Sequence, residues 1–308
     1  MSIALLVVGI ALIAAPRWLQ TRLGVLPAAE STRVTTLALT SGVIVVEAGL
    51  VMLALPTVLR AAGIPEVAHL CEEVLVHVTP GGPTIGWLAA ALAVGIPATA
   101  MHAASRAHVG ARALHVDPWL GRHEDKGSYE LVTVPTSRVM ALCVPGPRPQ
   151  VVVSSGLVEL LDTTELDAVI GHEIAHHQLR HHRLLALAVV VEQVFFLVPG
   201  ARRSAHVLRE EVERSADEQA ATRSQGPLPV SAALHAIARC SAVPDKPESD
   251  SVANRLRGLR RHGPSRIRSA RMLTYAPMAA LGIVGLAVAT AWVTDAHHLL
   301  ALGGHCFS

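Results

Sequence analysis

Four apolar stretches, each close to the length of a membrane span, constrain this chain more than any other feature. They cover residues 3–15, 34–58, 85–104 and 273–293. A helix needs about 20 apolar residues to cross the hydrocarbon, so the last three qualify and the first, extendable to Leu19, is marginal. Charged residues make up only 16% of the chain, against about a quarter in a typical soluble domain. We therefore expect a mostly α membrane protein with about four transmembrane helices and one modest soluble domain.

The arginines indicate how these helices are oriented. No basic residue precedes the first stretch, whereas Arg17 and Arg22 follow it. A secretory signal has the reverse order, so we interpret this stretch as a retained anchor. Seven arginines lie between residues 255 and 271 with no acidic residue among them. Because arginines gather in the cytoplasmic flanks of spans, we expect a multi-pass protein of the cell (plasma) membrane, with both termini outside and residues 105–271 in the cytoplasm.

The same arginine run has two other interpretations. It could be a nucleic-acid patch, but its position directly before a span favours the topological interpretation, so we expect no direct nucleic-acid partner. It could also bind anionic membrane lipid, which is then a partner of the protein.

Short strands and a well-marked helix start are predicted in the cytoplasmic part. Residues 131–134, residues 139–144 and the β-branched run Val151-Val152-Val153 are typical of short strands. Asp162 and Glu165 then match the pattern of a capping box, in which each side chain bonds the backbone of the other residue. Apolar residues follow at helical spacing, so the sequence predicts a helix that contains the next motif.

That motif is Gly171-His172-Glu173-Ile174-Ala175-His176, which has the form H-E-x-x-H. Residues four apart share a helix face, so both imidazoles can reach one metal ion. Glu173 lies beside them and is placed to act as the general base toward a water molecule. A motif this short also arises by chance, more readily in a chain with 17 histidines, and the residues would then form a plain polar helix face.

A third metal ligand is available downstream, because Glu213-Arg214-Ser215-Ala216-Asp217 places two carboxylates four residues apart. A catalytic zinc site needs three protein ligands and one open position. We predict one Zn²⁺ per chain, bound by the two motif histidines and Glu213, with Asp217 orienting a ligand histidine from behind. The alternative is a solvated acidic helix face. Three further histidines receive no role: His177, His181 and His182.

Residues 184–198 form another apolar stretch, which contains Glu192 and Gln193. An unpaired carboxylate is costly inside a membrane, so we expect a helix that lies on or dips into the membrane; a buried core helix is the alternative. The expected division is three transmembrane helices in residues 1–104, a zinc-peptidase domain in 105–271 that includes this helix, and a fourth transmembrane helix with a short outer tail in 272–308.

The segment from about residue 139 to residue 220 resembles the BlaR/MecR-type membrane metallopeptidases. The resemblance is carried by Val151-Val152-Val153-Ser154-Ser155-Gly156-Leu157, by His172-Glu173-Ile174-Ala175-His176, by Phe195-Phe196 with Pro199, and by Glu213 with Asp217. Many members of that family have cysteine where Ala216 stands. Alanine before the aspartate is the usual form in the HtpX-type and prenyl-protein proteases, which share the same core.

The resemblance implies an inserted α+β zincin domain of the gluzincin type. In such domains an extended substrate binds the edge strand of a small sheet above the zinc helix, and we assign that edge to Val151, Val152, Val153 and Ser154. It also implies three membrane helices before the domain and one after it. Antibiotic-sensing members carry an extracellular penicillin-binding domain after the last span, whereas this sequence ends at Ser308, so we expect no covalent β-lactam sensing.

These features predict an integral-membrane zinc metalloendopeptidase that hydrolyses peptide bonds of a cytoplasmic protein. The first expectation for that substrate is a winged-helix transcriptional repressor in a signalling pathway. A housekeeping protease that degrades damaged membrane proteins is the alternative, and a non-catalytic, zinc-stabilised membrane scaffold is a second one. The intact Glu173 argues against the scaffold, because a purely structural zinc site does not need it. A homodimer is compatible with each of these functions.

Overall fold

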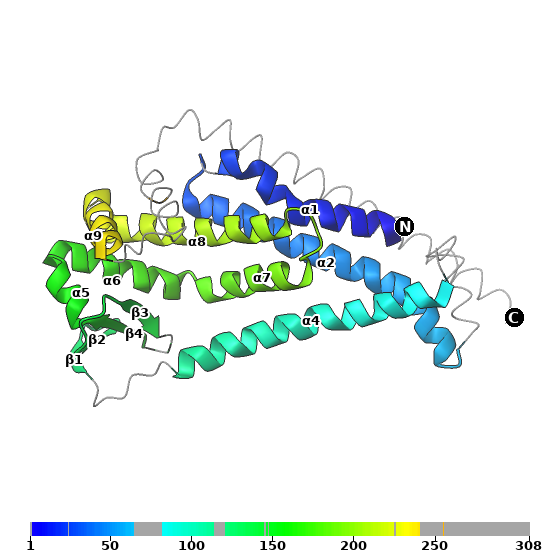
Figure 1. The fold of residues 1–308 in the computed structure, drawn as a ribbon, viewed down its shortest axis with the longest axis horizontal. Coiled ribbons are helices and arrows are strands. Elements are labelled where there is room, and N and C mark those ends of the chain that lie inside the picture. The colour runs from blue at the N-terminus through cyan, green and yellow to red at the C-terminus, as the bar shows by residue number, and fades with distance from the viewer. Residues whose placement is uncertain are drawn as a thin grey trace, which may run out of the picture.

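Three long apolar helices open the chain and pack beside the helices that follow the sheet (Figure 1). They are α1 (Ser2–Leu23), α2 (Ala28–Ala61) and α4 (Gly82–Ala113). By length and composition, α1, α2 and the Gly82–Ala103 part of α4 can each cross a membrane, which confirms the prediction of three apolar helices near the N-terminus. At 1.5 Å per residue the 22 residues of α1 span about 33 Å, close to the thickness of a hydrocarbon core.

The structure is a computed structural model, and it describes residues 2–23, 25–64, 82–113, 121–144, 146, 148–224, 226–240 and 255. The predicted fourth span at 273–293 and the arginines after residue 255 lie outside the described residues.

Helices α1 and α2 approach each other closely at two glycines. A Cβ atom on Gly42 would lie 2.7 Å from Cγ1 of Ile13 and 2.9 Å from the carbonyl oxygen of Gly9. A Cβ atom on Gly9 would in turn lie 2.6 Å from Cγ2 of Val46. All three distances are too short for a real side chain, so this helix contact depends on the two glycines, as is common between membrane helices.

A four-stranded sheet follows α4 at one end of the molecule (Figure 1). Its strands are β1 (Arg122–Asp125), β2 (Glu130–Val134), β3 (Ala141–Val144) and β4 (Gln150–Ser154). The order is β1-β2-β4-β3, with β2 and β4 parallel and the other two pairs antiparallel. The strands predicted at 131–134, 139–144 and 151–153 are therefore confirmed with small shifts in their bounds.

The edge-strand prediction for Val151, Val152, Val153 and Ser154 is wrong. Strand β4 has two neighbours, because Val151 pairs with Leu131 of β2 on one side and with Cys143 of β3 on the other. The three valines are at most 1% exposed, and a continuous β-branched run is typical of a strand buried on both faces. Among the described strands, the two with a single neighbour are β1 and β3.

Five helices complete the described fold: α5 (Ser155–Leu160), α6 (Thr163–Gln178), α7 (His181–Val194), α8 (Ala201–Arg223) and α9 (Pro227–Cys240). Helices α6 and α9 cover one face of the sheet. Their buried side chains, including Ile170, Ile174 and Ala233, pack against Val151 and Val153 of β4. The sheet therefore supports the helix that carries the H-E-x-x-H motif.

Helix α7 contains residues 184–194 of the apolar stretch predicted at 184–198. Its residues Ala188 and Val191 are buried in one cluster with Leu50 of α2 and Leu208 of α8. Glu192 accepts a hydrogen bond of 2.6 Å from Nη2 of Arg209, so its carboxylate is paired. These contacts agree with the alternative of a buried core helix, and contact of α7 with lipid stays a prediction.

Helix α8 connects the apolar helices to the sheet end of the molecule. The guanidinium of Arg214 donates to the carboxylate of Glu211 at 2.6 Å and to the carbonyl of Leu26 at 3.1 Å, in the turn between α1 and α2. The backbone amide of Ala28, at the start of α2, donates to the Glu218 carboxylate at 2.9 Å. The α1–α2 turn therefore holds one face of α8.

Candidate metal centre

The helix that carries the motif begins where the sequence predicted. Asp162 caps α6 by accepting a hydrogen bond from the backbone amide of Glu165 at 2.8 Å, and the Glu165 carboxylate accepts from the Asp162 amide at 3.1 Å. This reciprocal capping box satisfies two amides that the first helical turn leaves without partners. With its start fixed and one side packed on the sheet, α6 presents His172 and His176 toward α8, which lies beside it.

Two imidazoles and one carboxylate converge between α6 and α8. The Nε2 atoms of His172 and His176 lie 3.0 Å apart. Glu213 of α8 places its carboxylate oxygens 3.5 Å from the first Nε2 atom and 3.6 Å from the second. One ligand atom from each residue lies within 4.8 Å of the other two. Ligands of a tetrahedral zinc ion are separated by about 3.3 Å, so this donor set fits zinc in both chemistry and spacing.

Glu173 lies beside this group at the edge of the sheet. Burial raises the pKa of Glu173, and its carboxylate accepts a hydrogen bond from the backbone amide of Cys143 in β3. The raised pKa makes this carboxylate a better proton acceptor than an exposed glutamate. The strand next to the motif glutamate is thus β3, which has a strand neighbour on one side only among the described residues.

Asp217 contacts Nδ1 of His172, the ring nitrogen that does not face Glu213, as the sequence predicted. Its Oδ1 atom lies 3.0 Å from Nδ1 of His172, and its side chain is 2% exposed. Arg255 donates two hydrogen bonds to the same carboxylate, from Nε to Oδ2 at 2.8 Å and from Nη2 to Oδ1 at 2.6 Å. The guanidinium also lies 3.5 Å from Glu213, so one arginine contacts both Asp217 and Glu213 of α8.

The charges of this group depend on one another. Burial would lower the pKa of His172, but contacts with Asp217 and Glu213 raise it to about 9. Burial would raise the pKa of Glu213, but His172, His176 and Arg255 lower it to about 2. Burial and the charge of His172 lower the pKa of His176 to about 4. In the metal-free protein one proton is therefore held on His172 and the carboxylates stay ionised.

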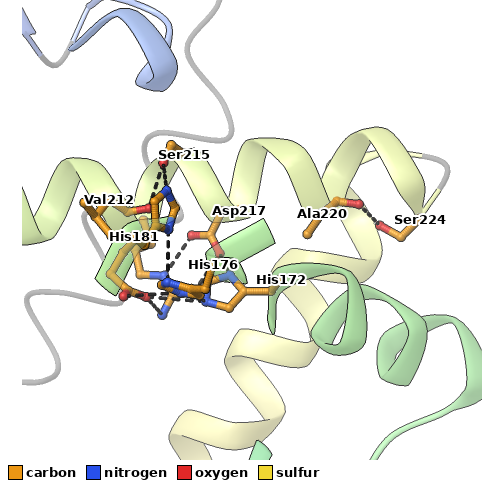
Figure 2. Close-up of polar contacts among 10 residues, drawn as sticks. His172, His176, His181, Val212, Ser215, Asp217, Ala220 and Ser224 are labelled. Atoms are coloured by element: carbon orange, nitrogen blue, oxygen red, sulfur yellow. Dashed lines mark hydrogen bonds and ion pairs between the residues drawn. The ribbon is translucent and has the colours of Figure 1, made fainter. Parts of the chain in front are cut away.

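His181 is a buried histidine that contacts Nδ1 of His176, the ring nitrogen that does not face Glu213. Figure 2 shows its ring between His176 and Ser215. The Nδ1 atoms of the two histidines lie 3.0 Å apart, and Nε2 of His181 lies 3.1 Å from Oγ of Ser215. Burial and the neighbouring His176 lower the pKa of His181 to about 4, so the ring is neutral.

A pocket of about 240 Å³ opens beside Glu173. Its polar end is formed by His172, Glu173, Asp217 and Arg255. The rest of its wall is apolar and comes from β3 and the two residues before it, from α5, from α6 and from α9, where Val230, Leu234 and Ile237 contribute. The cluster of charged groups therefore adjoins a space that suits an apolar side chain.

Sequence reasoning found five of the residues described here and missed two. His172, Glu173, His176, Glu213 and Asp217 lie together as predicted. Arg255 had been assigned to membrane topology with the other arginines, and the sequence gives no sign that it contacts Asp217. His181 follows His176 by five residues, a spacing that does not place two side chains on one face of a continuous helix.

Residues 104–241 match the model of Peptidase family M48. This range contains every residue of the metal centre except Arg255. The plastoglobule-localized metallopeptidase 48, chloroplastic, of Arabidopsis thaliana is 28% identical over 132 residues, which is 40% of this chain and 38% of that protein. The match to family M48 indicates a metallopeptidase of the zincin type, and the narrower resemblance to BlaR/MecR-type enzymes stays a prediction.

Proposed function

We propose that this protein is an integral-membrane zinc metalloendopeptidase. The observation that carries the proposal is the convergence of His172 and His176 of α6 with Glu213 of α8, beside Glu173. The first three residues would hold one zinc ion per chain. When bound, zinc supplies a Lewis acid for the peptide carbonyl and lowers the pKa of water to about 7.

Other groups of this chain act as the base, position a ligand and bind the substrate. Glu173, with its raised pKa, takes a proton from water and passes it to the leaving amine. Asp217 holds the imidazole of His172, and Arg255 holds Asp217. The side of β3 that has no strand neighbour among the described residues binds the extended substrate, because backbone groups without a strand partner can hydrogen-bond a peptide. This role replaces the one that the sequence assigned to Val151–Ser154.

We infer that the substrate is a cytoplasmic protein. The turn between α1 and α2 contacts α8 next to the metal centre, and α4 precedes the sheet, so the centre adjoins one end of the membrane helices. The arginines near that turn, Arg17 and Arg22, favour the cytoplasmic side. Among cytoplasmic proteins, a winged-helix repressor in a signalling pathway remains our first candidate, on the strength of the resemblance to BlaR/MecR-type enzymes.

The test separates metal binding from chemistry. Glu173→Gln removes the base and leaves the three metal ligands, so purified protein should keep one zinc per chain and lose about 100-fold to 10,000-fold in the rate of casein hydrolysis. Glu159→Gln, on the exposed side of α5, is the matched control and should cleave at the wild-type rate. Wild-type cleavage by Glu173→Gln would contradict the base assignment. Zinc binding without any cleavage by the wild type would favour the scaffold.

A housekeeping protease is the second candidate, and the apolar wall of the pocket favours it. Damaged membrane proteins present many apolar side chains, which such a wall accepts. Proteomics of cells that carry Glu173→Gln distinguishes the two candidates. Accumulation of one DNA-binding protein supports the regulatory enzyme, whereas accumulation of many membrane proteins supports the housekeeping enzyme.

A further inference from the structure

We propose that His181 is a positioning residue that holds the imidazole of His176 in the tautomer and orientation required for metal binding. The proposal rests on the proposed metal site and extends it to a residue outside the H-E-x-x-H motif. His181 acts through His176 and does not face the metal position itself.

The break between α6 and α7 brings His181 to this place. Helix α6 ends at Gln178, and Arg180 adopts a left-handed conformation with φ of 53°. His181 is the first residue of α7 and is only 1% exposed. Its ring meets that of His176 edge-on, with centroids 4.8 Å apart. A continuous helix would carry this side chain away from His176, so the turn creates the contact.

The direction of the hydrogen bonds follows from metal binding. His176 points its Nε2 atom at Glu213 and at Nε2 of His172, so this atom must lack a proton in order to ligate a metal. Its proton is then on Nδ1 and is donated to Nδ1 of His181 at 3.0 Å. Nε2 of His181 donates in turn to Ser215 at 3.1 Å, and the serine hydroxyl donates to the carbonyl of Val212 at 2.9 Å.

The opposite direction is incompatible with a metal ion. If His181 donated from Nδ1, His176 would carry its proton on Nε2, in the space where the ligand atoms converge. A second partner that fixes the tautomer is a general feature of metal-binding histidines. This series of hydrogen bonds ends on the carbonyl of Val212 in α8, the helix that also supplies Glu213. His181 therefore links His176 to the helix that carries Glu213.

The experiment compares two substitutions at one position. His181→Asn keeps an acceptor near the place of Nδ1, whereas His181→Leu fills similar space and has none. Zinc affinity, measured by competition with a chelator, should fall about 10-fold to 100-fold in His181→Leu and recover most of the loss in His181→Asn. His177→Leu, a half-buried histidine of the same tract, is the control and should bind zinc as the wild type does.

Thermal unfolding of the metal-free proteins checks that each variant is folded. Wild-type zinc affinity in folded His181→Leu would overturn the proposal. Equal losses in His181→Leu and His181→Asn would also overturn it, because packing alone would then explain the effect. The double substitution His172→Ala/His176→Ala tests the metal site separately: if that protein still binds zinc normally, the proposed function fails, whatever the variants of His181 show.

Discussion

The long apolar helices and the metal-centre end of this protein are held together by different means. Helices α1 and α2 meet where Gly9 and Gly42 remove side chains from the contact. The metal-centre end instead depends on buried polar groups in pairs, such as Asp217 with Arg255 and His176 with His181. The glycine contact is destabilised when a side chain is added to it, whereas a buried polar pair is destabilised when one of its partners is removed. Substitutions in the two regions should therefore fail in different ways.

The largest effect is expected for the ligands themselves. Glu213→Ala should reduce zinc affinity by more than the roughly 100-fold that loss of a supporting partner costs. The α1–α2 contact should be unaffected, so the metal-free variant should lose only the contacts that Glu213 makes with the two histidines and Arg255, and should remain folded. Chelator competition and thermal unfolding in detergent measure the two quantities. A large loss of stability without zinc would mean that the two regions are not separable in this way.

Arg214 lies where the two regions meet and should show the next largest effect. Its side chain and that of Glu211 are 10% and 6% exposed. Arg214→Met leaves the Glu211 carboxylate buried without its cation, which should destabilise the fold by about 3–5 kcal/mol. The double variant Glu211→Leu/Arg214→Met should recover most of that loss, and denaturant unfolding measures both. If the double variant is as unstable as the single one, the buried charge is not the cause.

Gly42→Ala tests the helix contact alone. The added methyl group would lie within 3 Å of Ile13 and Gly9, and overpacking of this kind costs about 1–3 kcal/mol. Gly95→Ala in α4 is the matched control, because nothing lies within 4 Å of its added Cβ. Zinc affinity should be unchanged in both variants. A drop in zinc affinity in Gly42→Ala would show that the helix contact also shapes the metal centre.

The smallest effect concerns pH and belongs to the metal centre alone. Zinc needs a neutral His172, whose pKa is raised to about 9 in the metal-free protein, so a proton competes with the metal below that pH. Zinc affinity should therefore rise about tenfold per pH unit from pH 6 to pH 8, which is about 1.4 kcal/mol per unit. Asp217→Asn removes one of the groups that raise this pKa and should flatten the slope. An equal slope in both proteins would assign the proton to another group.

Local sequence patterns were enough to predict some of these features. The apolar helices, the capping box at Asp162 and the motif in α6 each depend on residues close in the chain, and all three are confirmed. The convergence of Glu213 with the motif histidines was predicted from the chemistry that zinc requires, and the packing of α6 against α8 brings those side chains together.

The features that sequence reasoning missed depend on distant pairing. Strand β4 is central because β3, which precedes it, pairs on its other side, and no local pattern gives strand order. His181 contacts His176 only because Arg180 interrupts the helix. Arg255 lies 38 residues beyond Asp217 in the chain, and its place in a run of arginines before an apolar stretch led us to assign it to a membrane flank.

The contact between α8 and the α1–α2 turn has a consequence for the order of biosynthesis. Residues of the turn, Leu26 and Ala28, leave the ribosome first, whereas Arg214 and Glu218 of α8, their partners, are made nearly 200 residues later, at sequence separations of 188 and 190. Arg255 follows later still. A nascent chain thus lacks the complete metal centre, and any activity that depends on it, until most of the chain has been translated.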